Sequence, residues 1–252
     1  MRTLVFLDLD DTLFQTRRKC PPEADLHPVA YLEDGSANSF MTEGQKALWR
    51  LLDDNATLIP TTARNLGALR RVDLPFRSWS ILDYGGVILD PRGEPDAGWM
   101  ERMRAASGET LEELEALLEE AESFVARSAL SVRIRIIEDF GLPFYLVAKY
   151  RSGRAEDLER LHRDLVLPWL SLRQDRFRLH RNDNNLAVLP ATLGKEYAVR
   201  YLTERLSDAG ETLMTIGVGD SLIDGAFMAA CDFAITPRNS QLFGATLGRF
   251  AR

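Results

Sequence analysis

Aspartates follow two apolar segments of this 252-residue chain in a pattern that suits metal-assisted chemistry. The acids are Asp8 and Asp10 after residues 3–7, and Asp220 and Asp224 after residues 213–218. Short continuous apolar runs are typical of parallel strands buried on both faces. Because ligands in open α/β sheets bind at the carboxyl ends of the strands, we expect these carboxylates to meet at one sheet edge. Carboxylates that close repel one another unless a cation relieves them, and oxygen ligands favour Mg²⁺.

Asp224 has a second interpretation. Ser221-x-x-Asp224 is the pattern of a capping box at the start of a helix. Capping and metal binding are compatible, so the sequence leaves both roles open.

Two further positions suit a phosphate. Thr62 follows an apolar segment at 57–61, and Lys195 begins a predicted helix. A threonine hydroxyl donates to phosphate oxygens, and a lysine ammonium holds a phosphoryl group against an acidic nucleophile. Each residue alone is more often a helix cap or a solvated charge. Their order relative to the aspartates favours the functional interpretation.

The elements expected around these residues divide the chain. Single buried strands alternate with helices in two stretches, 1–90 and 188–252, and these predict one α/β body. Between them, residues 91–187 combine acidic helices with two hairpins, at 132–149 and 177–189, the second turning through residues 182–185. Thr110-x-x-Glu113 predicts a helix start within this insertion. A further hairpin is expected at 29–41.

Composition excludes several classes of protein. The net charge of −7 argues against nucleic-acid or membrane-surface binding. No apolar run reaches the roughly 18 residues of a membrane helix, and the first apolar stretch is too short for a signal peptide. Cys20 and Cys231 are far apart in the sequence, which indicates neither a disulfide framework nor a zinc site. We therefore expect a cytoplasmic protein.

The order of these motifs resembles the haloacid dehalogenase (HAD) superfamily. The motifs are Asp8-x-Asp10-x-Thr12, Thr62-x-Arg64, Lys195 and Gly219-Asp220-x-x-x-Asp224. The insertion with paired hairpins is similar to subfamily IIB, which holds sucrose-phosphatases, trehalose-phosphatases and Cof-type sugar phosphatases. The resemblance implies a Rossmann-like, three-layer α/β core with a parallel sheet, and an inserted α+β cap domain that selects the substrate.

The resemblance also implies a role for each motif. Asp8 would be the nucleophile that forms an aspartyl-phosphate, and Asp10 would protonate the leaving alcohol and then activate water. Thr62 and Lys195 would hold the phosphoryl oxygens. The implied Mg²⁺ ligands are Asp8, the backbone carbonyl of Asp10, Asp220 and Asp224.

Three positions depart from the usual family pattern. Asp11 and Ala63 stand where glycine is commonest, at positions where the backbone does the work. Ile223 replaces an asparagine just before Asp224, which leaves the metal-binding role of Asp224 open.

The implied function is a Mg²⁺-dependent phosphatase for a small phosphorylated metabolite, with a sugar phosphate favoured. A sugar phosphomutase and a non-catalytic metabolite-binding protein are the alternatives. Candidate substrate contacts are Arg64 and Ser221 in the core, and Arg133, Arg135, Lys149, Arg178 and Arg181 in the cap. The alternative for the cap cations is an exposed strand face that discourages edge pairing. The sequence identifies neither the substrate nor the oligomeric state.

Overall fold

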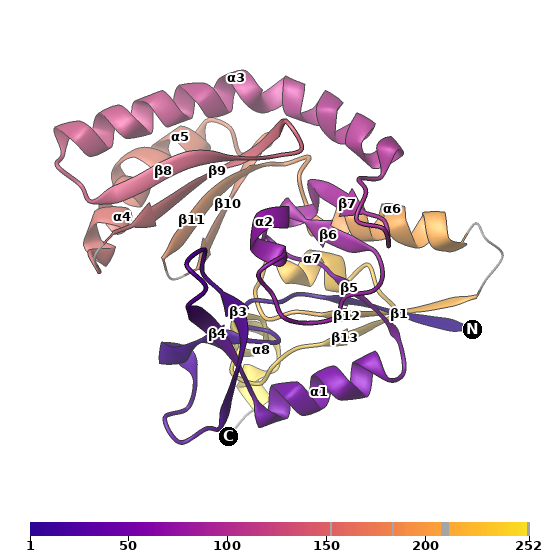
Figure 1. The fold of residues 1–252 in the computed structure, drawn as a ribbon. Coiled ribbons are helices and arrows are strands. Elements are labelled where there is room, and N and C mark those ends of the chain that lie inside the picture. The colour runs from indigo at the N-terminus through magenta and orange to yellow at the C-terminus, as the bar shows by residue number, and fades with distance from the viewer. Residues whose placement is uncertain (152, 183, 208–211, 251–252) are drawn as a thin grey trace. The chain divides into compact units, whose positions relative to one another are not determined.

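The computed structural model divides the chain into two compact units (Figure 1). It describes all residues except 152, 183, 208–211 and 251–252, so residue 183 of the predicted turn at 182–185 lies outside the described residues. The core unit comprises Met1–Trp99 and Gly194–Arg252, and the cap unit comprises Met100–Leu193.

The chain passes from the core unit to the cap unit between Trp99 and Met100, later than the predicted boundary between residues 90 and 91. Side-chain contacts hold residues 91–99 in the core unit. The carboxylate of Asp96 accepts a hydrogen bond from the Tyr201 hydroxyl at 2.7 Å, and the Trp99 indole donates to the Gly85 carbonyl at 2.9 Å. Because of these contacts, the core unit extends to Trp99.

A four-stranded parallel sheet forms the centre of the core unit. Its strands, in spatial order, are β13 (Phe233–Ile235), β12 (Leu213–Val218), β1 (Arg2–Leu7) and β5 (Thr57–Pro60). Val5 and Leu7 face α1 (Glu43–Asp53), whereas Gly217 faces α7 (Asp224–Met228) on the opposite side. The resulting three layers, visible in Figure 1, confirm the predicted α/β core.

Smaller elements complete the core unit. The hairpin expected at 29–41 is confirmed as β3 (Leu26–Tyr31) and β4 (Ala37–Thr42), with β2 (Gln15–Thr16) pairing on β4. The other elements are η1 (Arg17–Lys19), α2 (Leu66–Leu69), β6 (Ser80–Leu82), η2 (Asp83–Gly85), β7 (Val87–Leu89), α6 (Lys195–Ser207), α8 (Gln241–Thr246) and η4 (Gly248–Phe250).

The cap unit contains an antiparallel sheet with helices on one face (Figure 1). Its strands, in spatial order, are β10 (Phe177–Asn182), β11 (Asn185–Pro190), β9 (Leu142–Tyr150) and β8 (Val132–Asp139). The helices are α3 (Ala97–Arg127), α4 (Ala155–Leu161), the π-helix η3 (His162–Val166) and α5 (Leu167–Ser171). Leu117 of α3 packs against Leu146 and Val188 of the sheet. Both predicted hairpins of the insertion are therefore present.

Two predicted helix starts were wrong. Thr110 lies inside α3, where its hydroxyl donates to the Ala106 carbonyl at 3.4 Å and does not cap the helix. The buried side chains of Met100 and Met103 extend the apolar face of α3 before this position, so tertiary packing overrides the capping pattern. The helix expected from Ser221 begins at Asp224, after a turn.

Within the described residues, no helix is both long and apolar enough to span a bilayer.

Candidate active site

Three buried aspartates meet at the carboxyl edge of the core sheet. Asp8 follows β1, Asp220 follows β12, and Asp224 begins α7. One carboxylate oxygen from each lies within 4.8 Å of the others, and the three residues are 6%, 7% and 1% exposed. A side chain at Gly219 would bring its Cβ to 2.6 Å from the Asp224 Cβ, so glycine permits this close approach.

Lys195 supplies a positive charge within the acidic cluster. Its Nζ donates to the Asp8 Oδ1 at 2.5 Å and to the Asp224 Oδ1 at 2.7 Å, and the residue is 3% exposed. Burial disfavours the charged ammonium, but the carboxylates of Asp224 and Asp8 outweigh burial and raise the pKa of Lys195. Lys195 is therefore charged at neutral pH.

The Lys195 ammonium balances only part of the negative charge of the three carboxylates. Burial, followed by the neighbouring carboxylates of Asp224 and Asp220, raises the pKa of Asp8 well above its usual range. Burial and then the carboxylates of Asp224 and Asp11 raise the pKa of Asp220 to about 7. For Asp224, burial is outweighed by Lys195 and Ser221, which lower its pKa.

Three carboxylates against one ammonium fit a hard divalent cation. Such a cation takes oxygen ligands, and its charge relieves the repulsion between buried carboxylates. The donor set Asp8, Asp220 and Asp224 therefore fits a hard divalent cation in chemistry and charge.

Thr12 links two of the aspartates, a contact that its motif does not predict. Its Oγ1 lies 3.1 Å from the Asp8 Oδ2 and 3.2 Å from the Asp220 Oδ1. The preceding residue, Asp11, has a φ of +62°, the left-handed region that glycine adopts most easily, and its carboxylate binds Lys19 at 2.5 Å. The spacing of Thr12 four residues after Asp8 was the only sequence signal for this contact.

Asp10 lies outside the acidic cluster and binds Arg64 through both carboxylate oxygens. The Arg64 Nε and Nη2 donate to the Asp10 Oδ2 and Oδ1, each at 2.7 Å. The guanidinium also lies 5.2 Å from the centre of the Phe14 ring. Arg64, predicted as a substrate contact, therefore binds a neighbouring acid in this structure, and metal binding by the Asp10 backbone carbonyl stays a prediction.

Thr62 and Ser221 are both held by local contacts. The Oγ1 of Thr62, which follows β5, accepts a hydrogen bond from the Arg64 backbone at 3.1 Å. The backbone N–H and the hydroxyl of Ser221 donate to the Asp224 Oδ2 at 3.0 and 2.5 Å. Asp224 thus accepts from Ser221, the residue expected to be its capping partner, and from Lys195. Metal binding by Asp224 stays a prediction.

The predicted cap contacts do not share one surface. Arg133 pairs directly with Lys149 across β8 and β9, Arg135 lies two residues further along, and the strand register puts Arg178 on the same sheet face. Arg181 lies on the opposite, helix-covered face. There its Nη1 contacts the Glu159 carboxylate at 2.6 Å and the His162 ring at 2.7 Å. Arg178 and Arg181 therefore lie on opposite sheet faces, because residues three apart on a strand point to opposite sides.

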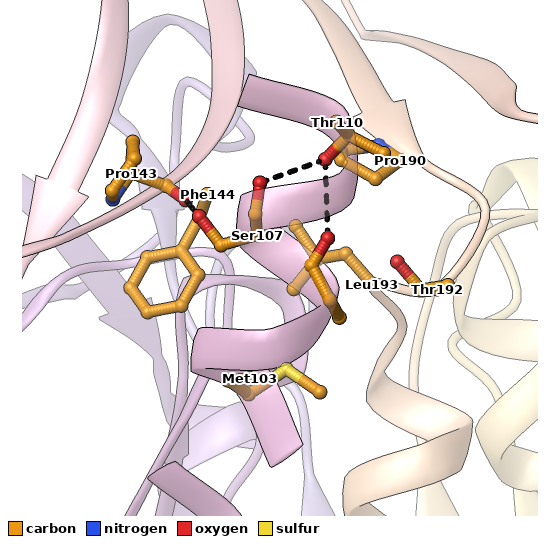
Figure 2. A pocket seen from close by; sticks show the side chains of 9 residues that line it. Met103, Ser107, Thr110, Pro143, Phe144, Pro190, Thr192 and Leu193 are labelled. Carbon is orange, nitrogen blue, oxygen red and sulfur yellow. Dashed lines mark hydrogen bonds between the residues drawn. The ribbon is translucent and has the colours of Figure 1, made fainter. Parts of the chain in front are cut away.

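The cap unit also contains a small open pocket of about 210 Å³, shown in Figure 2. Its lining is Met103, Ala106, Ser107, Thr110, Pro143, Phe144, Pro190, Thr192 and Leu193. None of these side chains ionises, and the Ser107 hydroxyl already donates to the Pro143 carbonyl at 2.7 Å. The pocket lining therefore has no side chain that could serve as a general acid or base.

Comparison with known proteins bears on the fold alone. No protein-family model matches the chain, and no curated protein matches it. Solved structures do match over both units, and they show that the chain has the fold of the haloacid dehalogenase-like hydrolases with an inserted cap.

Three of these structures illustrate the sequence identity, coverage and TM-score of the matches. The sucrose-phosphatase of Synechocystis sp. PCC6803, solved with sucrose and phosphate, is 15% identical; the match covers 100% of this chain and 98% of that one, with a TM-score of 0.56. A trehalose-6-phosphate phosphatase related protein is 19% identical over 92% and 85% of the two chains, with a TM-score of 0.51. A haloacid dehalogenase-like hydrolase from B. subtilis is 15% identical over 96% and 91%, with a TM-score of 0.50.

Proposed function

We propose that this protein is a Mg²⁺-dependent phosphatase that hydrolyses a small phosphorylated metabolite, a sugar phosphate by preference. The observation that carries the proposal is the buried group of Asp8, Asp220 and Asp224 around Lys195 at the end of β1. Sugar phosphatases among the solved structures with this fold support the choice of substrate class.

In the proposed reaction, a carboxylate oxygen of Asp8 attacks the substrate phosphorus and the ester P–O bond breaks. Asp10 gives its proton to the departing alcohol oxygen. Asp10 then removes a proton from water, the water oxygen bonds to phosphorus, and the Asp8–phosphorus bond breaks. Inorganic phosphate leaves, and both aspartates return to their starting forms.

The surrounding residues lower the electrostatic cost of this attack. Lys195 and Thr62 hold the phosphoryl oxygens, so the anionic phosphate does not face Asp8 uncompensated. Asp8, Asp220, Asp224 and the Asp10 backbone carbonyl would hold Mg²⁺. When bound, the ion neutralises charge on the nucleophile and on the phosphate.

Arg64 orients Asp10 for these proton transfers. Its guanidinium engages both Asp10 oxygens, each of which keeps a second lone pair. The bidentate contact therefore fixes the direction of the carboxyl group.

We assign substrate selection to the cap unit. The sheet face with Arg133, Arg135 and Lys149 offers three cations for hydroxyl or anionic groups of the substrate. The core motifs, by contrast, recognise only phosphate and metal.

The test is phosphate release from a panel of sugar phosphates, phosphoglycosyl glycerates and nucleotides, with Mg²⁺ and with EDTA. We expect Mg²⁺-dependent release from a few sugar phosphates. Isomerised hexose phosphate with little free phosphate would indicate the mutase instead. Binding without turnover of any substrate, including a generic aryl phosphate, would contradict both enzymes.

A further inference from the structure

We infer that Gln45, on α1 and outside all four motifs, is a positioning residue for the acidic cluster. This inference rests on the proposed function, because it concerns how Asp8 and Asp220 are held for metal binding and catalysis. Gln45 reaches these aspartates through the Thr12 carbonyl and hydroxyl.

The carboxamide of Gln45 ties three segments of the core unit together. Its Nε2 donates to the Thr12 carbonyl at 3.2 Å and to the Gln15 Oε1 at 2.6 Å. Its Oε1 accepts from the Thr42 backbone N–H at 2.9 Å and from the Thr42 hydroxyl at 3.1 Å. Two protons and two acceptor positions are thus all used. Two of the partners are backbone groups of fixed polarity, which determines the orientation of the amide.

Thr12 connects Gln45 to the aspartates. It is 1% exposed, and its hydroxyl lies between the Asp8 Oδ2 and the Asp220 Oδ1. The loop that carries it passes through the left-handed conformation at Asp11, so its shape depends on tertiary contacts. Gln45 thus binds the Thr12 carbonyl, while the Thr12 hydroxyl bridges two predicted metal ligands, Asp8 and Asp220.

Helix capping alone does not explain a glutamine at position 45. Thr42 caps α1, and the capping box needs only an acceptor at position 45, which glutamate provides equally well. The bond to the Thr12 carbonyl requires a donor, which only the amide provides. Gln45→Glu therefore keeps the cap and the side-chain length but places a carboxylate oxygen against the Thr12 carbonyl.

Thr42→Ala is the matched control. It removes the hydroxyl of the cap, while the Gln45 Nε2 can still donate to Thr12. We expect its melting temperature to fall by about 2–4 °C with Mg²⁺ affinity unchanged. Gln45→Glu should also lower the melting temperature by a few degrees, but unlike Thr42→Ala it should weaken Mg²⁺ affinity about 10-fold or more.

The experiment measures Mg²⁺ binding by isothermal titration calorimetry, together with kcat and KM for phosphate release. For Gln45→Glu we expect kcat to fall about 10-fold with KM for the phosphate ester within about 2-fold, because substrate contacts are untouched. Charge alone predicts the reverse for the metal, since an added carboxylate attracts cations. Unchanged or tighter Mg²⁺ binding in Gln45→Glu would therefore overturn the inference.

The result also separates this inference from the proposed function. If the wild-type protein neither binds Mg²⁺ nor releases phosphate, the proposed function fails. If the wild type does both and Gln45→Glu matches it, only the role of Gln45 fails. If Gln45→Glu does not fold, Gln45→Met decides the question: weaker Mg²⁺ binding than in Thr42→Ala supports the inference, and equal binding contradicts it.

Discussion

The core unit and the cap unit both gather charged side chains, but they hold them in different ways. In the core, Asp8, Asp224 and Lys195 are almost wholly buried and bonded to one another. In the cap, Arg133 and Lys149 are exposed and lie opposite each other on β8 and β9. Buried charges need fixed partners, whereas exposed ones can change at little cost in stability. The difference suits a core that performs one reaction and a cap that adapts to the substrate.

The strongest test of this contrast replaces the proposed nucleophile. Asp8→Asn keeps the shape of the side chain and the contact with Thr12 but removes the attacking carboxylate. We expect phosphate release to fall by roughly 10³-fold or more for every substrate. A melting curve like that of the wild type shows that the fold is intact. Substantial release by this variant would rule out Asp8 as the nucleophile.

Removing the buried cation tests how far the core depends on its partners. Lys195→Met fills a similar volume but leaves the carboxylates of Asp8 and Asp224 without their ammonium partner. Breaking a buried pair in this way costs about 3–5 kcal/mol, and we expect kcat to fall by about 100-fold or more. Urea unfolding with EDTA measures the first effect. A loss of less than about 1 kcal/mol would mean that Lys195 is not the charge that balances the cluster.

The sequence predicted the meeting of the aspartates because a parallel sheet brings the carboxyl ends of its strands together. Leu7 pairs with Val218, so the residues that follow both strands arrive at the same place. The bidentate contact of Arg64 with Asp10 depends instead on loop conformation, as does the bridge at Thr12. Residue types and spacing place these residues near one another but do not specify either contact.

One wrong prediction and one overlooked distinction have different physical causes. The capping pattern at Thr110 was a genuine local signal, but burial of Met100 and Met103 extends the helix through it. For Arg181, the alternation of side chains along a strand already distinguished its sheet face from that of Arg178. That distinction was in the sequence, but naming the two residues together by their charge did not use it.

A smaller effect concerns pH in the absence of metal. Asp220 has a pKa of about 7, above its usual value, so its deprotonation is less favourable in the folded state than in the unfolded state. In EDTA this carboxyl therefore lowers stability progressively as pH rises from about 4 to about 7. Asp220→Asn should be more stable than wild type at pH 8 by up to about 4 kcal/mol, and equal to it near pH 4.

Melting temperatures across this pH range, with and without Mg²⁺, provide the measurement. Mg²⁺ should stabilise the wild type at pH 8 more than it stabilises Asp220→Asn, because the variant offers one fewer carboxylate. If the difference in melting temperature between wild type and Asp220→Asn is constant from pH 4 to pH 8, the Asp220 carboxylate is not destabilised by burial and by the neighbouring carboxylates.

The smallest expected effects lie in the cap, where Arg133 and Arg181 form a matched pair of the same residue type on opposite sheet faces. Arg133→Ala should raise KM for the best substrate several-fold with kcat and stability unchanged, because the side chain is exposed. Arg181→Ala should leave KM unchanged and lower stability by about 1 kcal/mol, since it loses contacts with Glu159 and His162. If Arg181→Ala changes KM and Arg133→Ala does not, the helix-covered side of the sheet, rather than the face that carries Arg133, affects substrate binding.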